Sequence, residues 1–175
     1  MLEASESREI VIDAPIETVY EVITDFERYP EWASALKRAS IVEQSRDKGS
    51  TDASDPSRQY PRVVEFEGGA LGFGVRYKLE YEFDPPRLLK WRLVDGEIRG
   101  FLIRAAIRSL EGSYEFERLS ERRTKATYSL SVAVPLAVGP LRAKAEQIVM
   151  DTGLADLKKR AEQVADMRLA RATDD

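Results

Sequence analysis

The chain has 175 residues, of which 43% are hydrophobic and 33% are charged, so we expect one globular domain, residues 1–175, with a sizeable core. Its 27 basic and 31 acidic residues give a net charge of −4 and are mixed along the chain, which argues against nucleic acid as a partner because a nucleic-acid surface is broadly basic. The sequence contains neither cysteine nor histidine, which excludes disulfides, zinc–thiolate sites and the commonest general base.

Targeting and membrane-spanning signals are not evident in the sequence. No stretch approaches the roughly 20 apolar residues that cross a bilayer. The N-terminal MLEASESREI lacks the basic and then apolar order of a secretory signal. We therefore expect a cytoplasmic protein without stable membrane insertion.

A strand and two short helices are the first elements predicted. REIVIDA alternates in polarity and predicts a strand over residues 8–14, and apolar residues at helical spacing predict a helix over 15–24 with Pro15 in its first turn. Asp25 can cap a second short helix. Because Pro30 disfavours a helical conformation at Tyr29, the aromatic stretch DFERYPEW is expected to bend or to break into two short helices.

The middle of the chain predicts an antiparallel meander. A strand is expected around residues 38–44, and residues 45–58, rich in turn formers and nearly free of apolar side chains, predict a mobile loop or a long hairpin tip. Every odd position of residues 73–83 is apolar or aromatic, which is typical of a strand with one buried face. The same alternation, separated by turn signals such as Gly68-Gly69 and Asp95-Gly96, predicts further strands around Phe66, Trp91, Tyr114 and Tyr128.

The C-terminal segment predicts one long helix, from residue 139 to about 171. Its middle is apolar nearly all round, at positions such as Val149, Met150 and Leu157, which predicts burial. Only this helix is long enough to cover the apolar face of the sheet, and a twisted sheet of this size curls. The expected fold class is α+β, with a curled antiparallel sheet of about seven strands wrapped around a long C-terminal helix and two short helices after the first strand.

The order of these elements resembles a known family, the polyketide cyclase/dehydrase and coenzyme Q-binding START-domain branch of the START-related (SRPBCC, birch-pollen-allergen-like, helix-grip) superfamily. The resemblance spans nearly the whole chain, in the segments VIDAPIETVYEVITDFERYPEW, WRLV, LEGSYEFE, TYSLSVAVPL and DTGLADLKKRAE. It implies a helix-grip fold with a deep apolar cavity between sheet and helix, open at one end. The resemblance is specific for the fold and poorly specific for the function.

The same resemblance implies a role for DFERYPEW. In the family, this segment joins two short helices that form a cradle under one end of the long helix. Phe26 and Trp32 are therefore expected to plug the base of the fold, with Pro30 setting the bend. On this basis Trp32→Ala is expected to cost about 3 kcal/mol or more of stability.

Candidate ligand-binding residues follow from the inward face of the sheet. Buried phenols normally need hydrogen-bond partners, so the inward tyrosines can set polar points in an apolar cavity, or their hydroxyls can reach the rim and meet water. Gly153, in mid-helix, can leave room for a ligand or permit close contact between helix and sheet. The other candidates face either a ligand or the core, and the full set is Phe66, Phe73, Tyr77, Tyr81, Trp91, Tyr114, Phe116, Tyr128, Met150, Gly153 and Leu154.

Residues 98–109, IRGFLIRAAIRS, are a second point of interest because apolar side chains alternate with Arg99, Arg104 and Arg108. An extended hairpin with an ordinary core face is the favoured interpretation. The alternative is a lid whose arginines meet an anionic head group or a membrane surface, which would make a transient membrane contact.

Catalytic motifs are largely missing. The sequence has no GxSxG elbow, Walker loop or dinucleotide fingerprint, and carboxylate pairs such as Glu65/Glu67 fall on the outward strand face. Asp52 and Asp55 would bind calcium only with further oxygen ligands. We therefore identify no catalytic residue, metal site or cofactor, and the oligomeric state is not predicted.

The expected function is binding or transport of a hydrophobic small molecule, lipid-, quinone- or polyketide-like, in an internal cavity. One alternative is a polyketide aromatase/cyclase or dehydrase in which cavity tyrosines and an arginine orient a poly-β-ketone. Another is an interaction module like the ribosome-association toxin relatives.

Overall fold

The computed structural model describes residues 2–44, 60–70, 72–135 and 139–174. Its elements are β1 (Leu2–Ile12), α1 (Ile16–Thr24), a 3₁₀ turn η1 (Phe26–Arg28), α2 (Tyr29–Trp32), β2 (Leu36–Gln44), β3 (Pro61–Ala70), β4 (Phe73–Asp84), β5 (Leu88–Arg99), β6 (Arg104–Ala106), β7 (Ser109–Ser120), β8 (Arg123–Val134) and α3 (Gly139–Thr173). The loop expected at residues 45–58, with Asp52 and Asp55, lies outside the described residues.

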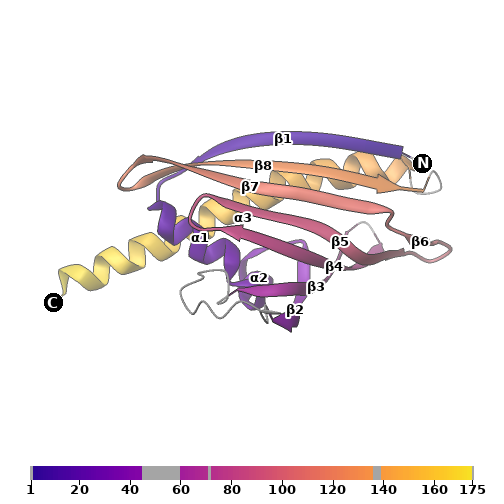
Figure 1. Ribbon diagram of the computed structural model, residues 1–175, viewed down its shortest axis with the longest axis horizontal. Helices are drawn as coiled ribbons and strands as arrows, with labels where there is room; N and C mark the ends of the chain where they lie inside the picture. Colours follow the sequence, from indigo (N-terminus) through magenta and orange to yellow (C-terminus); the bar gives the residue numbers. More distant parts are fainter. Residues whose placement is uncertain (1, 45–59, 71, 136–138, 175) are drawn as a thin grey trace, which may run out of the picture.

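The strands form one antiparallel sheet in the order β1-β8-β7-β5-β4-β3-β2, with the short β6 paired to β5. The predicted meander is confirmed, and the chain closes it by placing its first strand beside its last one (Figure 1). β1 begins at Leu2 and not at residue 8, because it pairs with β8 along its whole length, from Leu2 opposite Val134 to Ile12 opposite Thr124. The polar residues at the start of β1 are therefore strand residues.

The prediction of a turn at Asp95-Gly96 is wrong. β5 continues through Gly96 to Arg99, and the register against β4 shifts by one residue, so that Leu93 faces Leu79 while Asp95 faces Lys78. Val94 is the extra residue of this β-bulge and is exposed. A bulge bends the strand and increases its twist, which allows β5 to extend toward β6 instead of turning back.

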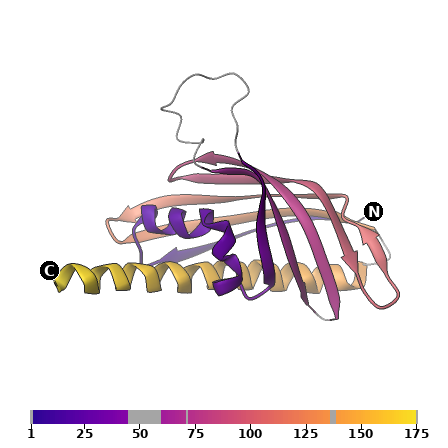
Figure 2. The same ribbon diagram turned by 90° about the horizontal axis from the view of Figure 1, so that it is seen from below.

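α3 lies along the concave side of the curled sheet (Figure 2), as expected for a helix-grip fold. Its buried residues recur every three or four positions and form a single stripe, consisting of Met150, Leu154, Leu157, Ala161 and Ala165. The prediction of burial all round the helix is wrong, because Val149 and Ala155 are exposed. The sheet contacts the helix along this stripe, and Ala155, which lies off the stripe, stays in contact with solvent. No helix in the described part of the chain is long and apolar enough to cross a membrane.

The aromatic stretch at residues 25–32 folds into η1 and α2, which confirms the prediction of two short pieces. Tyr29 is helical, with φ −52° and ψ −42°, although Pro30 follows it. Pro30 lies in the first turn of α2, where its missing N–H is not needed. Asp25 occupies the N-cap position of η1 but makes no capping hydrogen bond with its side chain. Its carboxylate instead pairs with Arg28 at 3.4 Å.

Phe26 is the centre of this corner, with 2% of its surface exposed. Its ring packs against Tyr29 and Tyr81 at centroid distances of 5.4 and 4.6 Å. Phe26 is thus buried at the base of the fold, as expected. Trp32, by contrast, is only partly buried, so it does not plug the base.

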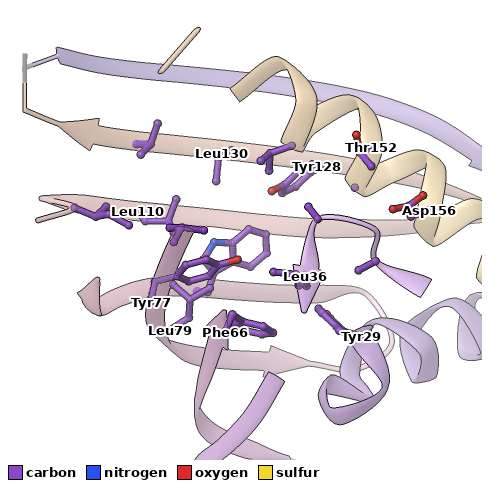
Figure 3. Close-up of a pocket in the computed structure, with 18 of the residues that line it drawn as sticks. Tyr29, Leu36, Phe66, Tyr77, Leu79, Leu110, Tyr128, Leu130, Thr152 and Asp156 are labelled. Atoms are coloured by element: carbon purple, nitrogen blue, oxygen red, sulfur yellow. The ribbon is translucent and has the colours of Figure 1, made fainter. Parts of the chain in front are cut away.

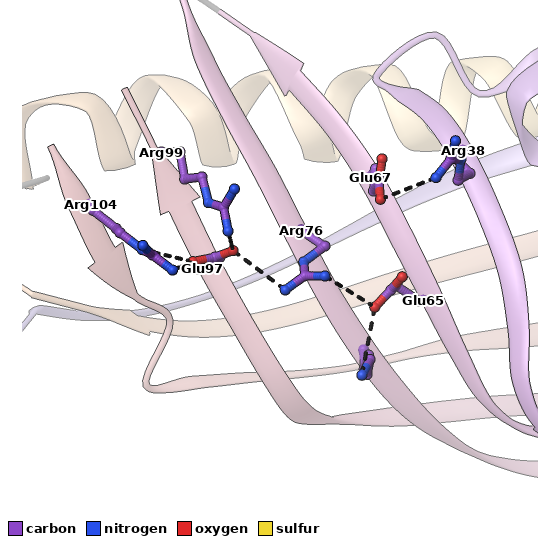
Figure 4. A network of polar contacts seen from close by, with 8 residues as sticks. Arg38, Glu65, Glu67, Arg76, Glu97, Arg99 and Arg104 are labelled. Atoms are coloured by element: carbon purple, nitrogen blue, oxygen red, sulfur yellow. Dashed lines mark hydrogen bonds and ion pairs between the residues drawn. The ribbon is translucent and has the colours of Figure 1, made fainter. Parts of the chain in front are cut away.

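The outer face of the sheet carries charged side chains, as alternation predicts (Figure 4). Arg76 lies between Glu65 and Glu97, at 3.9 and 3.5 Å, and Glu97 also pairs with Arg99 and Arg104. Glu65 and Glu97 are therefore ion-pair partners of arginines and point away from the helix.

Candidate ligand-binding cavity

A cavity of about 340 Å³ lies between the concave face of the sheet and α3 (Figure 3). Phe66, Tyr77 and Leu79 of the sheet lie across it from Thr152 and Asp156 of α3. Its volume falls in the range of small-molecule sites, roughly 300–1,000 Å³. The cavity exists because a curled sheet of long strands cannot be filled by one helix contacting it along a single stripe.

Most of the candidate residues from the sequence line this cavity, namely Phe66, Phe73, Tyr77, Tyr81, Trp91, Tyr114, Tyr128 and Gly153. The other candidates, Phe116, Met150 and Leu154, do not line it and are buried in the core. Phe116 shares a face with Tyr114 but packs edge-on against Tyr20 of α1, with ring centroids 6.1 Å apart. Met150 and Leu154 belong to the stripe with which α3 contacts the sheet.

The structure adds lining residues that sequence analysis did not single out. Strand alternation could have indicated some of them, because Leu130, Val132 and Val134 follow Tyr128 on the same face of β8. Trp32 and Leu36 carry no such signal, since their position depends on how α2 packs against the end of the sheet. Trp32 lies beside Tyr29, with ring centroids 4.9 Å apart, and forms part of the cavity wall.

Three aromatic rings form a continuous wall on the sheet side. Tyr114 and Tyr128 are direct cross-strand partners, and their rings stack at a centroid distance of 4.5 Å and an angle of 10°. Trp91 packs against both, at 5.5 and 5.8 Å. The indole lies over Gly112, where an added Cβ would come within 2.3 Å of the Trp91 ring. A glycine at this position is therefore what gives the indole its place.

Two buried tyrosines at the edge of the fold have backbone partners. The Tyr20 hydroxyl donates to the Leu88 carbonyl at 2.8 Å, and the Tyr29 hydroxyl donates to the Ile23 carbonyl. The first of these bonds fixes α1 to β5, and the second fixes α2 to α1.

Tyr29 also lines the cavity, but the other four lining tyrosines differ from it, because the hydroxyls of Tyr77, Tyr81, Tyr114 and Tyr128 have no hydrogen-bond partner among the described residues. Tyr81, Tyr114 and Tyr128 are at most 9% exposed, so their hydroxyls do not reach an exposed rim. Burial raises the pKa of each of these phenols, including that of Tyr77. They therefore stay protonated and can donate hydrogen bonds into the cavity.

α3 contributes polar groups and space to the opposite wall. The Asp156 carboxylate accepts hydrogen bonds from the backbone N–H and the hydroxyl of Ser34, at 2.9 and 2.8 Å, which ties α3 to the segment after α2. At Gly153 an added Cβ would lie 3.5 Å from the Tyr114 hydroxyl and 3.6 Å from the Tyr128 ring. These are ordinary contacts, so the missing side chain is not required for close packing and leaves room in the cavity.

The described lining carries few charged side chains. Asp156 is the only carboxylate, and no arginine is present, among the described lining residues. The part of the chain that the structure describes holds no group of three or more potential metal ligands. What the cavity offers is aromatic surface with neutral phenol donors.

Comparisons with known proteins agree with this arrangement. Residues 3–162 match the model of the family described as polyketide cyclase / dehydrase and lipid transport. No curated protein matches the sequence.

Several solved structures share the fold. A START superfamily protein from Mycobacterium smegmatis is 20% identical, with a TM-score of 0.73 over 91% of this chain and 98% of that one. The Zhui aromatase/cyclase from a Streptomyces species is 18% identical, with a TM-score of 0.69 over 96% of each chain. A conserved protein from Geobacillus kaustophilus is 13% identical, with a TM-score of 0.69 over 93% of this chain and 96% of that one.

At these identities the neighbours establish the fold, and the family match, which covers most of the chain, establishes the family. The chain is thus a member of the polyketide cyclase/dehydrase and lipid transport family, with the helix-grip fold of the START-related superfamily.

Proposed function

We propose that this protein binds or carries a hydrophobic small molecule in its cavity, of lipid-, quinone- or polyketide-like character. The observation that carries the proposal is an apolar cavity of about 340 Å³ into which buried tyrosines present hydroxyls without a partner among the described residues. A flat ring system would pack on Trp91 and Tyr128, and its oxygens would accept hydrogen bonds from the phenols.

The energetics are compatible with useful affinity. Burying about 300 Å² of apolar ligand surface would contribute roughly 7 kcal/mol before the costs of association. The walls come from paired strands and a long helix, so little ordering is needed on binding. Micromolar affinity then requires no reacting group.

Filling the cavity tests the proposal. Gly153→Leu places a side chain against Tyr114 and Tyr128, and we expect it to weaken binding of the probe anilinonaphthalene sulfonate at least about tenfold. Ala155→Leu is the matched control, because Ala155 is exposed on the same helix. Fluorescence titration measures both, and native mass spectrometry of the parent should show co-purified ligand. Equal binding by the two variants, with only unliganded mass, would contradict the proposal.

The tyrosine hydroxyls call for a separate test with two probes of matched shape. Menadione carries two carbonyl oxygens and methylnaphthalene carries none. We expect Tyr114→Phe and Tyr128→Phe to weaken menadione binding by about 1 kcal/mol each and to leave methylnaphthalene binding nearly unchanged. Tyr60→Phe is the control, since Tyr60 stacks on Phe83 and does not line the cavity. Calorimetry showing equal losses for both probes would argue against hydrogen bonding by the phenols.

A second candidate function is that of a polyketide aromatase/cyclase or dehydrase. The observation that favours it is the set of buried phenols whose pKa is raised, because neutral donors can polarise the carbonyls of a folded poly-β-ketone, and holding a chain in one fold supplies much of such catalysis. A synthetic poly-β-ketone thioester separates the functions. A cyclase changes the rate and pattern of ring closure, whereas a carrier binds the compound and leaves the products of the buffer reaction unchanged.

The cytoplasmic location and the interaction module like the ribosome-association toxin relatives stay predictions. No feature of the described residues favours the latter over ligand binding.

A further inference from the structure

The hairpin of β5 and β6 ends in an exposed apolar tip. The Gly100 N–H donates to the Ile103 carbonyl at 2.7 Å, which closes a tight turn with Phe101 and Leu102 at its apex. Phe101 is 98% and Leu102 is 88% exposed. Isolated exposed apolar residues are common, but two adjacent large ones at the apex of a hairpin form a projecting apolar surface that water does not favour.

Arginines flank this tip on both strands. Arg99 and Arg104 pair with each other next to the turn, and Arg108 follows β6 farther from it; all three are exposed. Glu97 accepts hydrogen bonds from Arg99 and Arg104 and so offsets part of their charge. Arg108 has no ion-pair partner among the described residues. This end of an otherwise acidic chain is therefore locally basic.

The inner face of the same hairpin leads to the cavity. Ile98 and Ile107 line the cavity, and Ile103 packs in the small apolar cluster of Ile107 and Val134. Phe73 joins the two regions. It lines the cavity, and its ring packs against Gly100, where an added Cβ would lie only 2.5 Å from the Phe73 Cε1. Apolar surface therefore continues from the exposed tip to the cavity wall.

We propose that the β5–β6 hairpin docks this protein on anionic lipid bilayers, with Phe101 and Leu102 inserted into the interface and the arginines at the level of the head groups. Exposed apolar side chains next to arginines are typical of a surface that binds an anionic membrane interface. The tip is too small for a stable protein interface, which needs about 800 Å² per partner. Docking itself is independent of the proposed function, whereas transfer of a hydrophobic ligand between bilayer and cavity rests on it.

Flotation with vesicles tests the docking. We expect the full chain to bind vesicles of phosphatidylcholine mixed with phosphatidylglycerol, to bind pure phosphatidylcholine vesicles less, and to dissociate partly as salt is raised. The double substitution Phe101→Ser with Leu102→Ser should lower the partition coefficient about tenfold or more. Leu119→Ser is the matched control, because Leu119 is 45% exposed on the β7–β8 hairpin at the other end of the molecule (Figure 1), also beside arginines.

The substitution Phe101→Trp gives a direct reading of depth. The fluorescence that this substitution adds to that of Trp32 and Trp91 should shift to the blue on vesicles and be quenched by brominated lipid chains. The proposal is overturned if the parent binds neither vesicle, if the Phe101 and Leu102 variant binds as the parent does, or if light scattering shows that the tip instead mediates self-association. It is also overturned if brominated lipid chains do not quench the fluorescence added by Phe101→Trp and this fluorescence shifts to the blue only when a protein partner is present.

A loss of docking and a failure of the proposed function are distinguishable. The Phe101 and Leu102 variant leaves the described cavity lining untouched, so it should bind anilinonaphthalene sulfonate as the parent does. If the parent docks on vesicles but Gly153→Leu does not affect probe binding, docking stands and the cavity proposal fails.

Discussion

Two glycines show opposite uses of a missing side chain. At Gly112 an added Cβ would meet the Trp91 ring at 2.3 Å and the Ser129 carbonyl oxygen at 2.7 Å, whereas at Gly153 the nearest atoms lie at 3.5 and 3.6 Å. The strand glycine is needed for packing, and the helix glycine is not. The difference predicts opposite effects of the same substitution.

We expect Gly112→Ala to destabilise the fold by about 1–3 kcal/mol, because the indole and a backbone strand must both move. Gly153→Ala should stabilise it by up to about 1 kcal/mol through helix propensity. Urea unfolding followed by tryptophan fluorescence measures both. Equal effects of the two substitutions would show that Trp91 does not depend on Gly112.

A third residue-scale prediction concerns the free phenols. Because the Tyr114 hydroxyl has no partner among the described residues, Tyr114→Phe should leave the stability of the unliganded protein unchanged or raise it slightly. Tyr20→Phe, which loses a hydrogen bond to the Leu88 carbonyl, should cost about 1 kcal/mol. Denaturation of the two variants without ligand checks the contrast, and a larger loss for Tyr114→Phe would reveal a hydrogen bond in the free protein.

The short helices at the N-terminal end contain one residue that we expect to matter mainly for stability and one that we expect to matter also for binding. Phe26 is 2% exposed and packs against several rings of the sheet, so Phe26→Ala should cost about 3–5 kcal/mol. Trp32 is partly buried and lines the cavity, so Trp32→Ala should cost less than the value expected from sequence and should also weaken probe binding. Thermal unfolding and fluorescence titration of both variants check this. A larger loss of stability for Trp32→Ala than for Phe26→Ala would show that Trp32 plugs the base of the fold after all.

For the molecule as a whole, the ion pairs of the sheet predict the dependence of stability on pH. Hydrogen bonds from Arg62 and Arg92 lower the pKa of Glu80, and the bond from Arg99 lowers that of Glu97. A carboxyl whose folded pKa lies below the unfolded value contributes stability that is present above the unfolded pKa and lost as pH falls through the folded one.

We therefore expect stability to be nearly constant from about pH 6 to 8, since the chain has no histidine to titrate there. It should fall below the ordinary glutamate pKa of 4.5. Glu80→Gln should cost no more than about 1 kcal/mol at neutral pH and should reduce the decline in acid. Urea midpoints of both proteins across the pH range measure this, and an equally steep acid decline in the variant would assign the effect to other carboxyls.

The sequence by itself determined the order and type of most elements, the antiparallel meander and the aromatic inward face, but not the start of β1 or the path of β5 through Gly96. Strand alternation and helix spacing are local patterns, so the sequence alone identifies Tyr77, Tyr114 and Tyr128 as inward residues. The arginine-flanked hairpin at residues 98–109 was predicted for the same reason.

Only the tertiary structure decided which inward residues face a cavity and which face the core. Tyr114 and Phe116 lie on the same face of β7, yet Tyr20 of α1 packs against Phe116 while Tyr114 lines the cavity beside α3. Trp32 reached the cavity wall through the packing of α2, and the exposed apex of Phe101 and Leu102 depended on β5 passing through its bulge. Cavities are what remains between elements far apart in sequence, and a local pattern carries no information about the distance between them.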